Sequence, residues 1–400
     1  MGVNITYMGT KRDLVSFVSS AVKCSRDGIL LDAFSGMCSV GEEIGTERQI
    51  WSNDAQFFAS EVAHALFVSR EAPLSALSAA VIAFPAFRDH QNGLSTLLKR
   101  PLELEGESQA SIDFQHFEAT QKKLSSSLNR GAESLKGKKH SLFSRIYPNT
   151  YIGVAQAIEI DSIVQSIGKA VRDGTLSADQ RRWLQIALGR AILKCSSTTG
   201  HFAQFLRPKH GSFRTFLAQR RRRIWEEWLE SIELLCPVGT ASWRIQNRVF
   251  NEDALSLIRR LRRMRVRPSV IYADPPYTDD QYSRFYHLLE TLLIYDYPRV
   301  SGNGLYRRNR FQTSFSLRSK VTSAFRDFVS GVRGVGADLI LSYPSNGLLL
   351  EAGNNPLSIL REYFPHADCY MAVPHKHSTL GGSKGHVVDS VTEFIYMAKQ

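Results

Sequence analysis

The chain has 400 residues, of which 43% are hydrophobic and 22% are charged. This composition is ordinary for a globular protein and excludes a disordered or fibrous chain, and the length predicts either two domains or one domain with a large insertion. The 50 Lys and Arg residues exceed the 38 Asp and Glu residues and give a net charge of +12, which favours a polyanionic partner.

Five cysteines are present, and none belongs to a CxxC pair. Their spacing predicts neither a zinc module nor a disulfide framework, and it favours a reducing, cytoplasmic location. The chain has no run of 18 apolar residues and no signal-peptide pattern, so we expect no membrane span and no secretion.

The first 60 residues have the pattern of an α/β domain. Residues 13–23 predict an amphipathic helix, and the apolar run at 28–33 predicts a buried strand. A turn of small residues follows at 34–41, and then a second strand at 49–52 and a helix from about residue 57.

Strand signals are weak between residues 61 and 245. The pattern predicts helices over 63–83, 151–172, 177–195 and 213–235, and Ser177 with Gln180 has the spacing of a capping box. Residues 88–150 are polar, with clusters of Ser, Gly and Lys, and are predicted to contain long loops.

Alternating strands and helices return after residue 245. Strands are predicted at 248–250, 269–273, 338–342 and 392–398, with helices over 253–265 and 287–294. This alternation predicts a mostly parallel, Rossmann-like sheet. We therefore expect one discontinuous α/β domain, formed by 1–60 and 246–400 and interrupted by a mainly helical insertion over 61–245.

The strongest chemical signal is the segment Ala273-Asp274-Pro275-Pro276-Tyr277, directly after a hydrophobic strand. Ligands of open α/β sheets bind at the carboxyl ends of strands, so a site is expected at this position. The Asp274 carboxylate and the Pro275 carbonyl offer two adjacent acceptors, and Tyr277 offers a ring that can stack on a planar group. The segment is therefore suited to holding an exocyclic amine.

Two further features indicate a ligand site at the neighbouring strands. Gly36 and Gly41 allow the backbone after the first strand to approach a ligand closely. Asp54 ends the second strand, 22 residues after Asp32, where the acids of dinucleotide-binding folds bind ribose hydroxyls. The GxGxxG pattern of those folds is absent, which disfavours NAD.

With these motifs the sequence resembles the Dam-like, alpha-type DNA adenine-N6 methyltransferases, whose DPPY tetrapeptide is intact at 274–277. The resemblance covers roughly 1–60 and 246–298, and Cys38 stands where the family usually has a second glycine. Four other segments are similar to family motifs in type and order: 7–11 to the aromatic-x-Gly-x-Lys opening, 32–38 to the glycine-containing loop, 53–54 to the end of the next strand, and 250–253 to the short acidic motif.

The resemblance implies the fold of an S-adenosylmethionine-dependent methyltransferase, with the helical insertion as its target-recognition domain. S-adenosylmethionine is the expected methyl donor, and no metal is required. Lys11 is expected to face the methionyl carboxylate, and Asp253 is expected to face the adenine amine of the cofactor. The residues implied to bind the cofactor are Tyr7, Lys11, Asp32, Phe34, Gly36, Asp54 and Asp253.

The implied reaction is site-specific methylation of adenine N6 in double-stranded DNA, with Asp274, Pro275, Pro276 and Tyr277 as catalytic residues. The two acceptors localise the lone pair of the amine, and the methyl group then transfers by direct displacement. The base must first be flipped out of the duplex and stacked, here against Tyr277. Residues 281–283 and 286–287 follow closely and are candidates for the lining of the base pocket, although a structural role in a helix is favoured for His287.

Basic clusters predict the contacts to DNA. Residues 207–267 contain 15 Lys and Arg against 6 Asp and Glu. Basic residues interleaved with aromatic ones suit phosphate contacts and groove insertion, although a solvated basic helix face is the alternative for each cluster. The expected DNA-binding residues are Arg220, Arg221, Arg222 and Arg223 on one predicted helix, and Arg307, Arg308 and Arg310 in a predicted loop.

Two other classes of function stay open. One is a methyltransferase acting on RNA or on a protein amide, which usually has Asn at the position of Asp274, and the other is a catalytically silent nucleic-acid-binding relative. His375 and His377 have no Cys or acid at ligand spacing, so no metal site is expected. We expect a cytoplasmic protein, associated with the nucleoid through DNA binding. A cognate restriction endonuclease or a defence-system protein stays open as a partner, and so does a phage-borne or solitary role.

Overall fold

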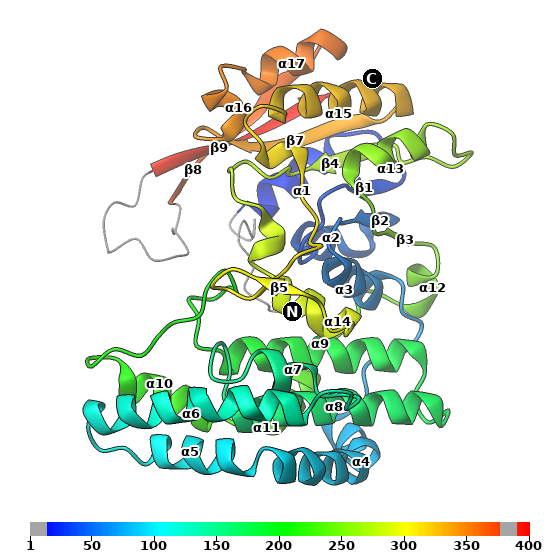
Figure 1. Cartoon of the computed structure of the whole chain (residues 1–400). Coiled ribbons are helices and arrows are strands. Elements are labelled where there is room, and N and C mark those ends of the chain that lie inside the picture. The colour runs from blue at the N-terminus through cyan, green and yellow to red at the C-terminus, as the bar shows by residue number, and fades with distance from the viewer. Residues whose placement is uncertain (1–13, 377–389) are drawn as a thin grey trace.

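The computed structural model describes residues 14–376 and 390–400. At its centre lies a seven-stranded sheet with the order β3-β2-β1-β4-β7-β9-β8 (Figure 1). Strands β3, β2, β1, β4 and β7 pair in parallel, whereas β9 is antiparallel to both β7 and β8. The expected mostly parallel α/β sheet is thereby confirmed. Its strands are β1 (Leu30–Asp32), β2 (Ile50–Asn53), β3 (Arg248–Phe250), β4 (Val270–Ala273), β7 (Asp338–Pro344), β8 (Asp368–Lys376) and β9 (Ser390–Ala398).

Different helices cover the two faces of the sheet, as the alternation of side chains along a strand requires. Leu30 packs into the hydrophobic cluster that includes α1, α2, α3 and α14, whereas its neighbour Leu31 packs with α13, α15 and α17. Burial on both faces explains why these strands are nearly continuous apolar runs. The helices are α1 (Val15–Lys23), α2 (Ser39–Ile44), α3 (Phe57–Phe67), α13 (Ala254–Leu261), α14 (His287–Ile294), α15 (Val321–Val335) and α17 (Pro356–Tyr363).

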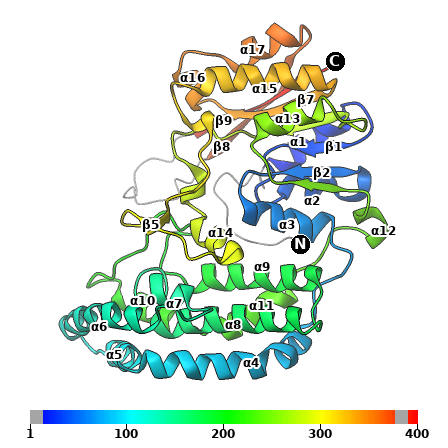
Figure 2. The same cartoon turned by 45° about the vertical axis from the view of Figure 1, so that its right-hand side comes forward.

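A layer of helices lies on the side of α3 and α14 that faces away from the sheet (Figures 1 and 2). Helix α9 packs against α3 and α14, and α8, α11 and α4 stack behind it. Buried residues of α8, α9 and α11 belong to the same cluster as the α3 face of the sheet, so the layer and the sheet share one core. The layer consists of α4 (Ala76–Leu97), α5 (Lys99–Gln109), α6 (Phe114–Ser134), α7 (Leu142–Ile146), α8 (Val154–Arg172), α9 (Ala178–Cys195), α10 (Phe213–Arg221) and α11 (Ile224–Glu233).

The prediction of long loops over 88–150 is wrong, because α4 to α7 occupy most of this region. Its Ser and Lys residues lie mainly on exposed helix faces, while Leu94, Leu98, Leu104 and Leu124 form a small buried cluster with α8. In this region, sparse apolar residues at helical spacing indicated the secondary structure better than the overall polarity of the segment did.

Two of the helices predicted as continuous are interrupted in the structure. The helix expected over 63–83 is interrupted between α3 and α4, and the helix expected over 213–235 is broken at Arg222 and Arg223, which both have extended backbone angles. At this break, Glu159 of α8 accepts hydrogen bonds from the Arg223 side chain at 2.5 Å and from Trp225 N–H at 3.2 Å. The hydrogen bonds to the buried Glu159 carboxylate therefore stabilise the break between the two helices. The capping box at Ser177 and Gln180 is confirmed.

Strand β8 and helix α15 were not predicted from the sequence. No helix within 14–376 and 390–400 combines the length and the apolar character that a membrane span needs.

Several smaller elements connect the sheet, its covering helices and the helical layer. The connecting elements are η1 (Gly45–Glu47), α12 (Ala241–Arg244), η2 (Tyr282–Arg284), β5 (Val300–Ser301), β6 (Tyr306–Arg307), η3 (Ser314–Ser316) and α16 (Leu348–Glu351).

Candidate active site

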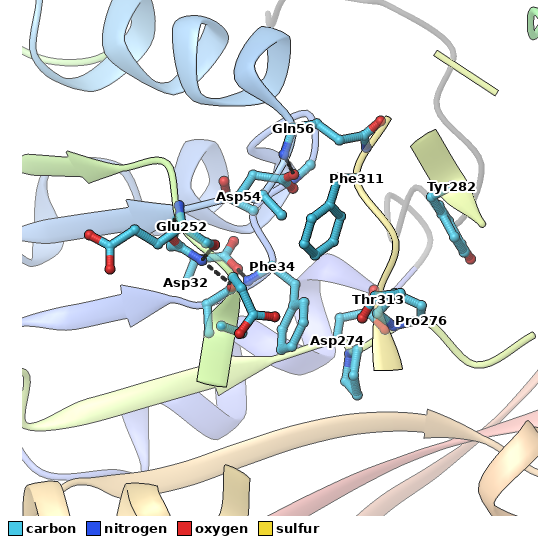
Figure 3. A pocket seen from close by; sticks show the side chains of 18 of the residues that line it. Asp32, Phe34, Asp54, Gln56, Glu252, Asp274, Pro276, Tyr282, Phe311 and Thr313 are labelled. Carbon is cyan, nitrogen blue, oxygen red and sulfur yellow. Dashed lines mark hydrogen bonds between the residues drawn. The ribbon is translucent and has the colours of Figure 1, made fainter. Parts of the chain in front are cut away.

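A cavity of about 990 Å³, counted out to its open mouth, lies at the carboxyl ends of β1, β2, β3 and β4 (Figure 3). In-register pairing brings these strand ends together, because Asp32 aligns with Ser52 on one side and with Tyr272 on the other. The cavity lies where parallel sheets bind ligands. Its lining includes Asp32, Phe34, Gly36, Asp54, Gln56, Glu252, Asp253, Asp274, Pro275, Pro276, Tyr277, Gln281, Tyr282, Ser283, Phe311 and Thr313.

The loop after β1 is shaped by two carboxylates. Asp32 Oδ1 accepts the N–H of Phe34 at 3.3 Å, and Asp54 Oδ2 accepts the N–H of Gly36 at 3.0 Å. Gly36 has a φ of 48°, in the left-handed region that glycine tolerates best. Cys38 also has a positive φ of 66°, but its side chain is buried in the core and does not line the cavity. The departure from glycine at this position therefore leaves the cavity wall unchanged.

Both carboxylates are buried, and their pKa values are raised. The pKa of Asp32 is raised to about 8, mainly by burial; the hydrogen bond from the Phe34 N–H lowers it, and the nearby Asp274 and Asp54 carboxylates raise it. Burial raises the pKa of Asp54 to about 6, although the N–H groups of Gln56 and Gly36 stabilise its ionised form. The site therefore holds carboxyl groups that ionise more readily once a cation lies beside them.

The third strand contributes Glu252 and Asp253. Asp253 is the N-cap of α13, with its Oδ2 accepting the N–H of Ser256 at 3.1 Å. Asn53 joins this strand end to the loop after β1, because its Nδ2 donates to the carbonyls of Ala33 and Glu252 at 3.0 and 3.1 Å. The backbone around the cavity is thus fixed by side chains from β2.

The DPPY segment follows β4, and all four of its residues line the cavity. Tyr277, the last residue of the segment, is anchored to the start of α16, because its carbonyl accepts the N–H of Leu348 at 2.8 Å. Gln281, Tyr282 and Ser283 line the cavity as expected, whereas Tyr286 and His287 lie in the core behind it. Burial lowers the pKa of His287 to about 3, so this histidine is neutral and structural.

Sequence reasoning missed several lining residues, among them Gln56, Phe311 and Thr313. Gln56 lies two residues after Asp54 and could have been found by extending that motif. Phe311 and Thr313 lie more than thirty residues after DPPY in a segment without a recognisable pattern, so only the fold brings them to the site.

The expected DNA-binding arginines divide into two groups. Arg220 is 5% exposed, donates to the carbonyl of Thr150 at 2.6 Å, and has a pKa lowered by burial to about 10. Arg307 is also buried and donates to both carboxylate oxygens of Asp296, at 2.6 and 2.7 Å. These two side chains do not face solvent, which corrects the expectation of a DNA contact at both positions.

The other five arginines are at least partly accessible. The chain is exposed at Arg221, Arg222, Arg223 and Arg308, and the Arg310 guanidinium lies 5.5 Å from the centre of the Tyr306 ring. Several make contacts within the protein: Arg221 donates to the carbonyl of Gln109 at 2.5 Å, and Arg222 to that of Lys194 at 3.2 Å.

Tyr7 and Lys11, which were expected to bind the cofactor, lie outside the described residues, and so does His377. Within the part of the chain that the structure describes, no group of three or more His, Cys, Asp or Glu side chains could hold a metal ion.

Comparison with known proteins gives a family match in the second half of the α/β unit. Residues 237–337, from the end of the helical layer through DPPY to α15, match the family model of D12 class N6 adenine-specific DNA methyltransferases. The resemblance expected from the motifs is confirmed in this region.

Curated proteins match over a longer stretch at lower identity. The chain is 23% identical to modification methylase LlaI of Lactococcus lactis subsp. lactis over 80% of its own length and 43% of that protein. It is 25% identical to type II methyltransferase M.FokI of Planomicrobium okeanokoites, over 86% of this chain and 45% of that one. It is also 25% identical to modification methylase StsI of Streptococcus sanguinis, over 89% of this chain and 46% of that protein. The chain thus spans less than half the length of these relatives.

Proposed function

We propose that this chain is a site-specific DNA methyltransferase that transfers the methyl group of S-adenosylmethionine to adenine N6 in double-stranded DNA. One observation carries the proposal: the DPPY segment at the end of β4 shares a single cavity with the acidic strand ends of β1, β2 and β3. The D12 family match and the methylase relatives support it.

The residues present fit S-adenosylmethionine. Its sulfonium is a cation, and the cavity wall carries the carboxyl groups of Asp32, Asp54, Asp253 and Asp274. In this proposal Asp54 holds the ribose, Asp253 holds the cofactor's adenine amine, and Gly36 with Phe34 forms the wall against the rest of the molecule. Tyr7 and Lys11 stay assigned to the methionyl end. When bound, the cofactor supplies an electrophilic methyl group, so no metal is needed.

The protein's part in the reaction is to prepare the adenine amine. The Asp274 carboxylate and the Pro275 carbonyl accept the two N6–H groups, which localises the nitrogen lone pair and aims it at the methyl group. Pro276 fixes the backbone between them and Tyr277, whose ring stacks on the base. As the N–C bond forms, the bond between the donor sulfur and the methyl carbon breaks. N6 also loses one proton, and Asp274 is placed to accept it.

Double-stranded DNA is the proposed partner, and the helical layer over 61–245 is the proposed target-recognition unit beside a catalytic unit of 1–60 and 246–400. The target base lies inside the duplex, so it must be flipped into the cavity. We assign phosphate contacts to the accessible Arg221, Arg222, Arg223, Arg308 and Arg310. The protein would then act in the cytoplasm, with a restriction endonuclease as one class of partner.

Single-molecule sequencing of DNA from cells that express the chain tests this proposal. The expected result is N6-methyladenine in one short sequence context, which disappears in the Asp274→Ala variant. Unmodified DNA with methylated RNA or protein amides would instead support the alternative substrate classes. A purified protein that binds S-adenosylmethionine and DNA but methylates neither strand would identify a silent relative.

A further inference from the structure

Residues 311–313, which we call the strap, border the cavity beside the DPPY segment. The strap follows the β5–β6 hairpin and leads into η3 and α15. Both Phe311 and Thr313 line the cavity. Immediately after the strap, the Phe315 ring packs edge-on against Phe34 of the β1 loop, with ring centres 5.4 Å apart. The segment that follows the strap therefore packs against the loop after β1.

Side chains that follow DPPY pin the strap in place. The amide of Gln281 is committed at both ends: its Oε1 accepts the N–H of Thr313 at 2.9 Å, and its Nε2 donates to the Thr313 carbonyl at 3.3 Å. Ser283 Oγ donates to the Phe311 carbonyl at 2.5 Å. Both ends of the Gln281 amide are therefore bonded to the backbone of the strap.

These bonds fix the backbone that carries Phe311, and the Phe311 side chain lines the cavity. Figure 3 shows the ring near the middle of the pocket, with Asp54 and Gln56 on one side and Thr313 and Pro276 on the other. Phe311 is half-buried and belongs to none of the hydrophobic clusters that the described residues form. A ring that lines a cavity, is carried by a hydrogen-bonded backbone and packs into no core cluster can offer its face to a planar ligand.

We propose that Phe311 is a base-contacting residue of the target pocket, and that Gln281 is the positioning residue that holds it there. This inference rests on the proposed function. A flipped adenine loses its stacking neighbours in the duplex, and an aromatic face replaces part of that loss. Phe311 supplies such a face in addition to Tyr277, and it does so from a segment that Gln281 and Ser283 fasten to the DPPY loop.

The first experiment compares Phe311→Leu with Phe311→Tyr, and with Phe17→Leu as the matched control. Phe17 is a partly buried ring on α1, outside the helical layer, and it does not line the cavity. Replacing a stacking ring by an aliphatic group should lower kcat/KM for a cognate duplex ~10- to 100-fold. Phe311→Tyr and Phe17→Leu should stay within a few fold of the wild type. The affinity for S-adenosylmethionine, measured by calorimetry, should be unchanged in all three.

A duplex with 2-aminopurine at the target position reports flipping and stacking separately. The wild type should flip the analogue and partly quench it by stacking, and Phe311→Leu should leave it brighter. If the wild type methylates DNA and Phe311→Leu keeps its full rate, this inference fails while the proposed function stands. Weaker cofactor binding in Phe311→Leu would assign the ring to the cofactor and also overturn it. An inactive wild type would overturn both.

The second experiment tests the positioning role of Gln281. Gln281→Met removes both bonds to Thr313, whereas Gln281→Glu keeps the acceptor for its N–H, so the Glu variant should recover part of the rate lost by Met. If Gln281 acts through Phe311, adding Gln281→Met to Phe311→Leu should cost little more than Phe311→Leu alone. Additive losses, or a Met variant with unchanged kcat, would contradict the role.

Discussion

The cavity end of the sheet and the helical layer use charge in different ways. At the cavity, Asp32 and Asp54 are buried, yet they stay beside open space and their oxygens organise the loop after β1. In the helical layer, Arg220 and Glu159 are also buried, but they join neighbouring helices and do not line the active-site cavity. A buried ionisable group indicates function only when space for a ligand adjoins it. Elsewhere the same burial indicates assembly of the fold.

The largest effect is expected at the cavity, where Asp274→Ala removes an acceptor for the target amine. We expect the methylation rate to fall ~10²- to 10³-fold, because preorganised electrostatic groups commonly contribute this much. Cofactor affinity should stay within a few fold, since the carboxylate acts mainly on the base. Rate and calorimetry on the same preparation check this, and a variant that keeps more than a few per cent of the rate would argue against it.

In the helical layer, a comparable change should affect stability instead. Arg220→Met leaves the buried Glu105 without the nearby cation that lowers its pKa, and it removes the bond to Thr150. We expect a loss of about 3 kcal/mol in the free energy of unfolding, as for other broken buried charge interactions. Arg221→Met, at the exposed neighbour, should cost less than about 0.5 kcal/mol. Equal melting temperatures for the two variants would contradict the contrast.

The same contrast explains what the sequence could and could not predict. The DPPY motif and the glycine loop follow buried strands, and strand ends of a parallel sheet meet at one edge, so their convergence was predictable. The fate of Arg220–Arg223 was not, because it depends on where Glu105 and Glu159 lie after helices distant in sequence have packed. Phe311 was hidden for the same reason, since Gln281 brings it to the site across thirty residues.

Asp54→Ala tests the part of the cavity that is proposed to bind the cofactor. The variant removes the acceptor for the N–H groups of Gly36 and Gln56, at 3.0 and 2.8 Å, together with the proposed ribose contact. We expect the dissociation constant for S-adenosylmethionine to rise ~10- to 100-fold, the range for a lost hydrogen bond to a charged group. The maximal rate at saturating cofactor should fall much less. Titration calorimetry decides, and an unchanged affinity would remove Asp54 from the binding site.

The raised pKa of Asp32 makes a prediction about stability and pH. With its folded-state pKa near 8 and an unfolded value of 3.8, Asp32 is protonated when folded and ionised when unfolded across this window. Unfolding then releases a proton, so the ligand-free protein should lose stability as pH rises from about 4 to 8, by at most about 1.4 kcal/mol per pH unit. Asp32→Asn should flatten this dependence. Denaturant titrations at several pH values measure it, and identical profiles for both proteins would exclude the effect.

The smallest expected effect concerns the accessible arginines of the helical layer. If Arg221 and Arg222 contact phosphates, replacing both with Gln should weaken binding to cognate and random duplexes alike. The slope of log affinity against log salt should then flatten by about 0.9 per contact, or about 1.8 in total. The matched control replaces Arg263 and Arg265, which are exposed on the α13 side of the sheet, and removes the same charge. Selective loss of cognate binding would mean that the pair reads bases, since phosphate contacts position the protein but do not specify sequence. Equal slopes for the two double variants would mean that the layer's exposed arginines, like its buried ones, serve the protein rather than the DNA.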